Sequence, residues 1–235
     1  KAAQKQILIK DASALENMRK VNALVIDKTG TLTIPNPNID FTKADNIPFE
    51  EREQLKPNAA KAMARLKEEG IDVFMMSGDK EAAAHYWAEK AGIEHYRSEV
   101  RPDDKQKLVS QLQQEGKIVA MVGDGINDTQ ALATADVGIA IGRGTDVAMD
   151  VAQVTLMGND LMALPEAVNM SRRTVRMIWQ NLFWAFIYNL VCIPLAAGAL
   201  YLFDINFQIT PMWASALMAF SSVSVVLNSL RLKWL

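Results

Sequence analysis

An aspartate early in the chain stands where a catalytic nucleophile could stand. Asp27 directly follows the apolar run 21–26 (VNALVI) and precedes Gly30. A carboxylate in such a turn can attack a phosphoryl group, and the free backbone amides of the turn can then bind the phosphate oxygens. A lone Asp-x-x-Gly is more often an ordinary turn, so this interpretation depends on the other motifs of the chain.

Two further turns carry groups that suit a phosphate and its metal ion. The motif SGD at 77–79 follows the apolar run 71–76 and offers a hydroxyl and backbone amides for a phosphate oxygen. The motif GDGIND at 123–128 follows the run 117–122 and places two carboxylates on a glycine-rich turn. Carboxylates are the hard oxygen ligands that Mg²⁺ prefers. Aspartates beside glycines can also be purely structural, but these follow a strand of the same predicted sheet.

A lysine could complete such a site. Lys105 lies near the start of the predicted helix 103–115, from where its ammonium group could neutralise the phosphate and the attacked carboxylate. The alternative is a solvated lysine on the helix surface, which holds for most lysines.

Strand-like and helical segments alternate along the chain. Strands are predicted at 21–26, 71–76, 117–122 and 137–141, and helices at 7–20, 58–69, 81–91, 103–115 and 130–135. This order predicts right-handed βαβ units and an α/β domain with a doubly wound parallel sheet. The reactive turns would then meet at the carboxyl ends of the strands. The stretch 34–57 contains four prolines and is predicted to be a loop.

The composition is that of a soluble domain joined to membrane segments. No charged side chain occurs in 177–203 or in 205–230, and each run exceeds the roughly 20 residues that cross a bilayer. The formal net charge of −2 argues against a nucleic-acid partner. The single cysteine, Cys192, excludes an internal disulfide and a CxxC metal site. The chain opens on Lys1 without a signal-peptide pattern, so we expect a piece of a longer protein.

Basic residues flank the two apolar runs at their outer ends. Arg172, Arg173 and Arg176 precede the first run, Arg231 and Lys233 follow the second, and the turn between them holds Asp204. The positive-inside rule then places the α/β domain in the cytoplasm of an integral membrane protein, for example of a bacterial inner membrane. The expected organisation is a lead-in helix (1–20), an α/β domain (21–160), a stalk helix (161–176), a transmembrane helix (177–203), an external turn (204–210) and a second transmembrane helix (211–230).

The motifs resemble those of the haloacid dehalogenase superfamily and, within it, the P-type ATPases. DKTGTLT at 27–33 is similar to the phosphorylation signature of these pumps, and GDGIND followed by Ala131 and Leu132 is similar to their hinge motif. The resemblance continues through 135–148 and covers nearly all of the chain except 34–57. It implies a haloacid dehalogenase-like, Rossmannoid domain followed by a transmembrane hairpin.

The resemblance also implies roles for individual residues. Asp27 would accept the phosphoryl group of ATP, with Ser77 and Lys105 holding it. Asp27, Asp124 and the backbone carbonyl of Thr29 would bind Mg²⁺, and Asp128 and Asn127 would organise the site. The other residues expected to contact the phosphoryl group or nucleotide are Lys28, Gly30, Thr31, Gly78 and Asp79.

Thr29 distinguishes an ATPase from a phosphatase in this superfamily. Phosphatases of the superfamily usually have a second aspartate two positions after the nucleophile, as general acid and base. Thr29 occupies that position here. Without the acid, an aspartyl-phosphate should persist, as a pump requires.

The apolar runs favour copper as the transported ion. They lack ionisable acids and bases, which argues against a site for Ca²⁺, Na⁺ or K⁺. A methionine thioether is a soft ligand that suits Cu(I), although a single membrane methionine is more often packing. The runs resemble those of the copper-transporting branch, which implies four transport ligands: Tyr188, Asn189, Met218 and Ser222. Cys192 and Met212 are weaker candidates, and we interpret Cys192 as packing.

Several parts of a complete pump are missing from the sequence. Segment 34–57 is too short for the nucleotide-binding domain that P-type ATPases insert there. His85 and His95 are not followed by the proline of the copper branch's ATP-binding pair, and Gln130 replaces the usual proline of the hinge motif. A Thr-Gly-Glu actuator motif and a Cys-Pro-Cys motif are also absent. We therefore expect no copper pumping by this chain alone. Its expected partners are the lipid bilayer, the remaining pump domains and a copper chaperone.

Two other functions remain open at this point. The chain could be a membrane-tethered phosphatase without a cap domain, which Thr29 disfavours and which loss of phosphatase activity in Asp27→Asn would support. It could also be a non-catalytic partner that binds an intact pump through its hairpin, which co-purification would detect.

Overall fold

The computed structural model describes residues 7–39, 47–142, 146–197 and 211–230. The chain divides into two compact units, residues 1–172 and 173–235.

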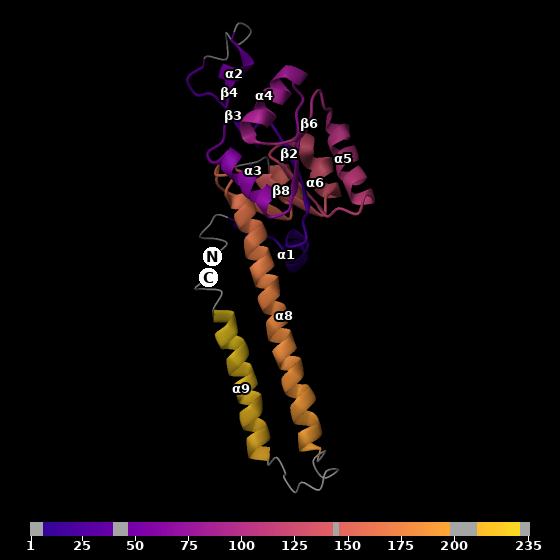
Figure 1. Cartoon of the computed structure of the whole chain (residues 1–235), viewed down its shortest axis with the longest axis vertical. Helices are drawn as coiled ribbons and strands as arrows, with labels where there is room; N and C mark the ends of the chain where they lie inside the picture. Colours follow the sequence, from indigo (N-terminus) through magenta and orange to yellow (C-terminus); the bar gives the residue numbers. More distant parts are fainter. Residues whose placement is uncertain (1–6, 40–46, 143–145, 198–210, 231–235) are drawn as a thin grey trace. The chain divides into compact units, whose positions relative to one another are not determined.

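A seven-stranded sheet forms the centre of the first unit, in the order β1-β9-β8-β7-β2-β5-β6 (Figure 1). Neighbouring strands pair in parallel except β1, which pairs antiparallel with β9. The strands are β1 (Ile7–Ile9), β2 (Ala23–Asp27), β5 (Asp72–Met76), β6 (His95–Arg97), β7 (Val119–Gly123), β8 (Val137–Ile141) and β9 (Val154–Leu156). All five residues of β2, β7 and β8 are buried, as expected for central strands that are covered on both faces.

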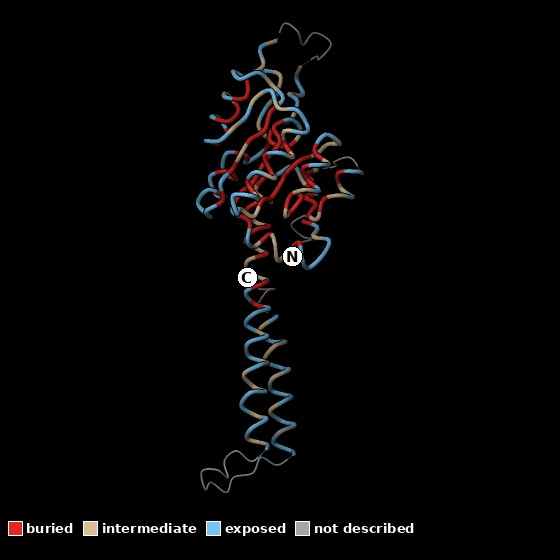
Figure 2. The backbone as a smooth tube through the Cα atoms, turned by 90° about the vertical axis from the view of Figure 1, so that its right-hand side faces the viewer, coloured by how far each residue is buried: buried red, intermediate tan, exposed pale blue. Residues whose placement is uncertain are grey.

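Helices cover both faces of the sheet and create two apolar cores. Figure 2 colours the buried residues red. Side chains of α1 (Ala12–Met18), α3 (Ala59–Glu68), α4 (Glu81–Ala91) and the start of α8 (Ala163–Ala196) build one core. Side chains of α5 (Pro102–Gln114), α6 (Thr129–Thr134) and α7 (Asp146–Val151) build the other. The predicted doubly wound α/β domain is therefore confirmed.

The lead-in segment differs from the prediction of one helix over 7–20. Ile7–Ile9 is strand β1, whose backbone pairs with the edge of β9, and helix α1 begins only after Asp11. The Asp11 carboxylate accepts a hydrogen bond of 2.6 Å from the backbone N–H of Ala14 and so caps the helix. The apolar triplet at 7–9 is therefore an edge strand and not the first turn of a helix.

The predicted loop 34–57 also contains regular structure. Strands β3 (Thr33–Pro35) and β4 (Glu53–Leu55) form a two-stranded antiparallel sheet, and the short helix α2 (Phe49–Arg52) leads into β4. The loop prediction was wrong here because prolines are compatible with these elements: Pro35 ends an edge strand and Pro48 precedes α2.

The second unit contains the apolar part of α8, from residue 173 onward, and helix α9 (Pro211–Leu230). Helix α8 runs without a break through 176–177, where the predicted stalk and span meet. Among the described residues, one helix is long and apolar enough to cross a membrane, over Ala163–Leu195, and Ser215–Leu230 is a shorter apolar helix. The predicted turn 204–210 lies outside the described residues.

Candidate active site

Asp27 is the last residue of β2, and a glycine turn directly follows it. The side chain of Asp27 is buried, and the residue pairs in register with Met76 on β5, so Ser77 follows at the same edge of the sheet. Gly30 has a φ of +75°, and a Cβ atom there would lie 1.9 Å from Oδ2 of Asp124. Only glycine therefore lets the Asp27 loop and Asp124 approach this closely.

Lys105 joins two of the carboxylates. Its Nζ lies 2.5 Å from Oδ1 of Asp27 and 2.7 Å from Oδ1 of Asp128, and all three side chains are buried. Burial opposes the charge on Lys105, but the two carboxylates outweigh it and raise the pKa of the ammonium group. The predicted meeting of Asp27 and Lys105 is thus present in the structure.

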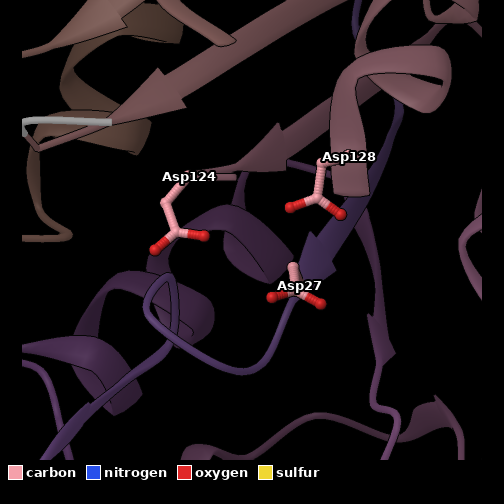
Figure 3. A group of neighbouring side chains, drawn as sticks. All are labelled: Asp27, Asp124 and Asp128. Atoms are coloured by element: carbon pink, nitrogen blue, oxygen red, sulfur yellow. The ribbon is translucent and has the colours of Figure 1, made fainter. Parts of the chain in front are cut away.

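Three carboxylates converge at this edge, as Figure 3 shows. Asp27, Asp124 and Asp128 each offer an oxygen atom, and these atoms lie within 4.8 Å of one another. Burial raises the pKa of Asp27 to about 6, although Lys105 favours its charged form. Burial, and then the charge of Asp128, also raise the pKa of Asp124. Crowded hard-oxygen ligands whose negative charge is only partly neutralised are chemically suited to Mg²⁺.

The second predicted motif, SGD, lies beside this cluster. The Ser77 side chain is buried, and its Oγ accepts a hydrogen bond of 3.1 Å from the backbone N–H of Asp79. The backbone N–H of Ser77 donates to the carbonyl of Arg97 at 2.9 Å, which fixes the turn against β6. Asn127, by contrast, is exposed.

Two residues of the DKTGT segment have unexpected surroundings. Lys28, predicted as a cofactor contact, is buried and forms ion pairs with Glu53 on β4 and, at 2.5 Å, with Asp79. Its ammonium group therefore links the loop after β2 to strand β4 and to the loop after β5. The Thr31 hydroxyl is buried and has no hydrogen-bond partner among the described residues. An unpaired buried hydroxyl in this loop is the kind of group that a bound ligand or water satisfies.

Lys56 is a candidate site residue that the sequence analysis missed. It directly follows β4, is buried, and its backbone N–H donates to the carbonyl of Leu32 in the nucleophile loop at 3.0 Å. Burial lowers the pKa of Lys56, while the charge of Asp124 opposes that change. A lysine in a proline-rich segment gives no sequence signal of this position, because only the β3–β4 hairpin brings it to the loop.

Three of the four predicted transport ligands lie on exposed faces of the two helices. Tyr188 is half-buried, whereas Asn189, Met218 and Ser222 are exposed. Nδ2 of Asn189 donates to the carbonyl of Ala185 at 3.0 Å, and Oγ of Ser222 donates to the carbonyl of Met218 at 3.2 Å. These polar groups therefore bond to their own helix. Of the two weaker candidates, Cys192 is half-buried and Met212 is exposed.

The chain is similar to one protein family and to individual copper-transporting ATPases. Residues 39–136 match the haloacid dehalogenase-like hydrolase family. The probable copper-transporting ATPase PacS of Synechocystis is 53% identical over 180 residues, which are 76% of this chain and 24% of that protein. The copper-exporting P-type ATPase of Legionella pneumophila is 35% identical over an alignment of 334 positions, covering 99% of this chain and 45% of that protein.

A solved structure with the same fold extends this similarity. The crystal structure of a zinc-transporting PIB-type ATPase superposes with a TM-score of 0.75 at 26% identity, over 98% of this chain and 53% of that one. The chain thus spans from a quarter to about half of the length of these relatives. It contains a haloacid dehalogenase-like hydrolase domain and is homologous over most of its length to copper-exporting P-type ATPases.

Proposed function

We propose that this chain supplies the phosphorylation domain and the last two membrane helices of an ATP-driven Cu(I) export pump, in which Asp27 becomes phosphorylated. The observation that carries the proposal is the buried cluster of Asp27, Lys105 and Asp128 beside Asp124. Burial of two carboxylates around one lysine, with a third half-buried beside them, is costly for folding unless the site has a function.

The geometry supports Asp27 as the nucleophile. Lys105 bonds to Oδ1 of Asp27, which leaves Oδ2 to attack the terminal phosphorus of ATP. The new Oδ2–P bond forms as the P–O bond to ADP breaks, and ADP leaves as an anion. With a pKa of about 6, Asp27 is about nine-tenths ionised at pH 7 and therefore available for attack.

The carboxylates also fit a Mg²⁺ ion. Asp124 and Asp27 would hold it, with Asp128 kept in place by Lys105. When bound, Mg²⁺ would offset the negative charge of the phosphoryl group and of the carboxylates. The backbone carbonyl of Thr29 stays a predicted ligand.

The side chain of Thr29 supports a pump over a phosphatase. A phosphatase of this superfamily needs a general acid and base two positions after the nucleophile, and a threonine hydroxyl does not titrate near neutral pH. An aspartyl-phosphate at Asp27 would therefore persist until another domain supplies a base.

The delivery of ATP would require protein outside this segment of sequence. Between DKTGTLT and α3, the described part of the chain holds the β3–β4 hairpin and helix α2. The Legionella alignment of 334 positions exceeds the 235 residues of this chain, so that pump carries roughly 100 residues without a counterpart here. A nucleotide-binding domain is the part that we expect among them.

The helical hairpin supports copper as the cargo. Asn189, Met218 and Ser222 present a soft thioether and neutral oxygen and nitrogen groups on exposed helix faces. We infer that they complete a Cu(I) site with helices outside this chain, in a membrane whose cytoplasmic side holds the α/β domain and a copper chaperone.

Binding of a phosphate analogue tests the proposed active site. Beryllium fluoride with Mg²⁺ should bind to the detergent-solubilised chain and give a protein-bound ¹⁹F resonance. Asp27→Asn should abolish this resonance, because the analogue needs a carboxylate oxygen as its fourth ligand. No bound resonance with folded wild-type protein, or an unchanged one in Asp27→Asn, would contradict the proposal.

A further inference from the structure

A cluster of amide and hydroxyl groups joins α8 to α9. Nδ2 of Asn181 on α8 donates to Oγ of Ser229 on α9 at 2.9 Å. Oδ1 of the same Asn181 side chain accepts from Nδ2 of Asn228 at 2.8 Å. Both ends of one amide group are therefore used between the helices.

Three other polar side chains of the described hairpin bond to their own helices instead. Asn189 and Ser222 bond to carbonyls of their own helices, and Oγ of Ser224 donates to the carbonyl of Ser221 at 2.8 Å. Most of the remaining surface of the two helices is exposed and apolar. Apolar side chains pack at several offsets along a helix, whereas hydrogen bonds between side chains are directional.

The burial pattern follows the register that these bonds impose. From the cluster onward, half-buried residues recur every three or four positions along each helix. They include Asn181, Ala185, Tyr188 and Cys192 on α8, and Leu217, Ser221, Val225 and Asn228 on α9; Ile187, Leu195 and Ser224 are half-buried as well. In an antiparallel pair that aligns Asn181 with 228–229, Ala185 lies level with Val225, and Tyr188 lies level with Ser221.

We propose that Asn181 is a positioning residue that fixes the register of the α8–α9 hairpin, with Asn228 and Ser229 as its partners. A buried asparagine that specifies register at some cost in stability is known from helical coiled coils. In a bilayer the effect has a further cause, because no water is available to satisfy an amide that loses its partner. A shift of one helical turn would separate all three groups.

The consequence concerns the predicted transport ligands. Tyr188 and Asn189 lie two turns along α8 from Asn181, while Met218 and Ser222 lie on the antiparallel helix. A one-turn slip of α9 would displace Met218 and Ser222 by about 5.4 Å relative to Tyr188. The Asn181 cluster would thus set the relative height of ligands that it does not touch. This step rests on the proposed copper function, but the register itself does not.

Cysteine cross-linking of the full chain in lipid nanodiscs tests the register. In a Cys192→Ser background, Ala185→Cys with Val225→Cys is the level pair, and Ala185→Cys with Ser221→Cys is offset by one turn. A short thiol-specific cross-linker should favour the level pair. Asn181→Leu should reduce that preference about threefold to tenfold, the effect of losing membrane hydrogen bonds.

Three controls make the outcome decisive. Gln180→Leu removes an exposed amide one residue away and should leave the preference unchanged. Asn228→Leu should act as Asn181→Leu does, and the double variant should add little to either, because the two side chains share one bond. An unchanged preference in Asn181→Leu, or an equal loss in Gln180→Leu, would overturn the proposal. Beryllium fluoride binding at Asp27, measured on the same samples, reports separately on the proposed active site.

Discussion

At the scale of single residues, Lys105 is the group on which the charge balance of the site depends. Its ammonium group contacts two buried carboxylates and faces a third across the cluster. A phosphoryl group would add more negative charge at the same point. We therefore propose that Lys105 both holds Asp27 before phosphorylation and stabilises the phosphorylated site.

Replacing this lysine should weaken phosphate-analogue binding. In Lys105→Gln we expect the affinity for beryllium fluoride to fall about 10- to 100-fold, since one charge-assisted contact is lost in a buried site. Lys107→Gln is the matched control, because Lys107 lies on the same helix with a 74% exposed side chain. Titration of the bound ¹⁹F signal measures both variants. Equal losses of beryllium fluoride affinity in the two variants would contradict a specific contact by Lys105 and would indicate a general effect of the positive charge on helix α5.

The raised pKa of Asp27 predicts how stability depends on pH. Its pKa of about 6 exceeds the ordinary value of 3.8, so between these values the folded protein binds more protons than the unfolded chain. Stability therefore falls as pH rises through this window and stays lower above it. Asp27→Asn, which cannot ionise, should be more stable than wild type at pH 7.5 by on the order of 2–3 kcal/mol.

The stability advantage of Asp27→Asn over wild type should shrink as pH falls from 6 towards 4. Hydrogen exchange of strand β2 would measure it, because buried central strands exchange through global unfolding. An Asp27→Asn variant that is no more stable at pH 7.5, or whose advantage grows in acid, would contradict the assignment of Asp27 as a buried, costly carboxylate.

At the scale of elements, the β3–β4 hairpin is coupled to the nucleophile loop. Glu53 on β4 pairs with buried Lys28, accepts a hydrogen bond of 3.2 Å from Thr33, and lies just before Lys56. Any domain inserted between β3 and β4 would thus be linked to Asp27 through the ion pair of Glu53 with Lys28, which directly follows Asp27.

Loss of this link should destabilise the loop. In Glu53→Gln, Lys28 keeps only the more exposed Asp79 as a counter-ion, so we expect a loss of about 1–3 kcal/mol in the free energy of unfolding. Glu51→Gln, at an exposed position of α2, should change it by less than about 0.5 kcal/mol. Denaturant unfolding of both variants makes the comparison. A Glu53→Gln protein as stable as its control would show that the buried ion pair does not hold the hairpin.

Long elements were predictable from the sequence and short ones were not. Helix α4 and strand β8 have the predicted bounds, because their apolar spacing and the glycine after α4 are local signals. Strands β1, β6 and β9 have three residues each and exist because a neighbouring strand supplies their partners. Local sequence carries no record of such a partner. The carboxylates and Lys105 were predictable because they belong to local motifs. Lys56 was not, because the β3–β4 hairpin brings it to the site and the prolines of 34–57 had indicated a loop there.

At the scale of the whole molecule, the chain holds the cluster of Asp27, Asp124, Asp128 and Lys105 but aligns with only 24% and 45% of the length of two copper-ATPase relatives. These two relatives are about three times as long, and the additional length includes roughly 100 residues within the aligned region of the Legionella pump. We therefore expect no copper-dependent ATP turnover by this chain in proteoliposomes. Adding the missing domains in one polypeptide should restore it. Copper-stimulated turnover by the chain alone would contradict this division of roles.

The most direct test of the account is the chemistry of Asp27 itself. The chain should be incubated with Mg²⁺ and radiolabelled acetyl phosphate, a small donor that needs no nucleotide domain, and then quenched in acid. We predict a label that is stable in acid, released by hydroxylamine as an acyl phosphate is, and absent from Asp27→Asn. Label that persists in Asp27→Asn, or that resists hydroxylamine, would show that Asp27 is not the phosphate acceptor.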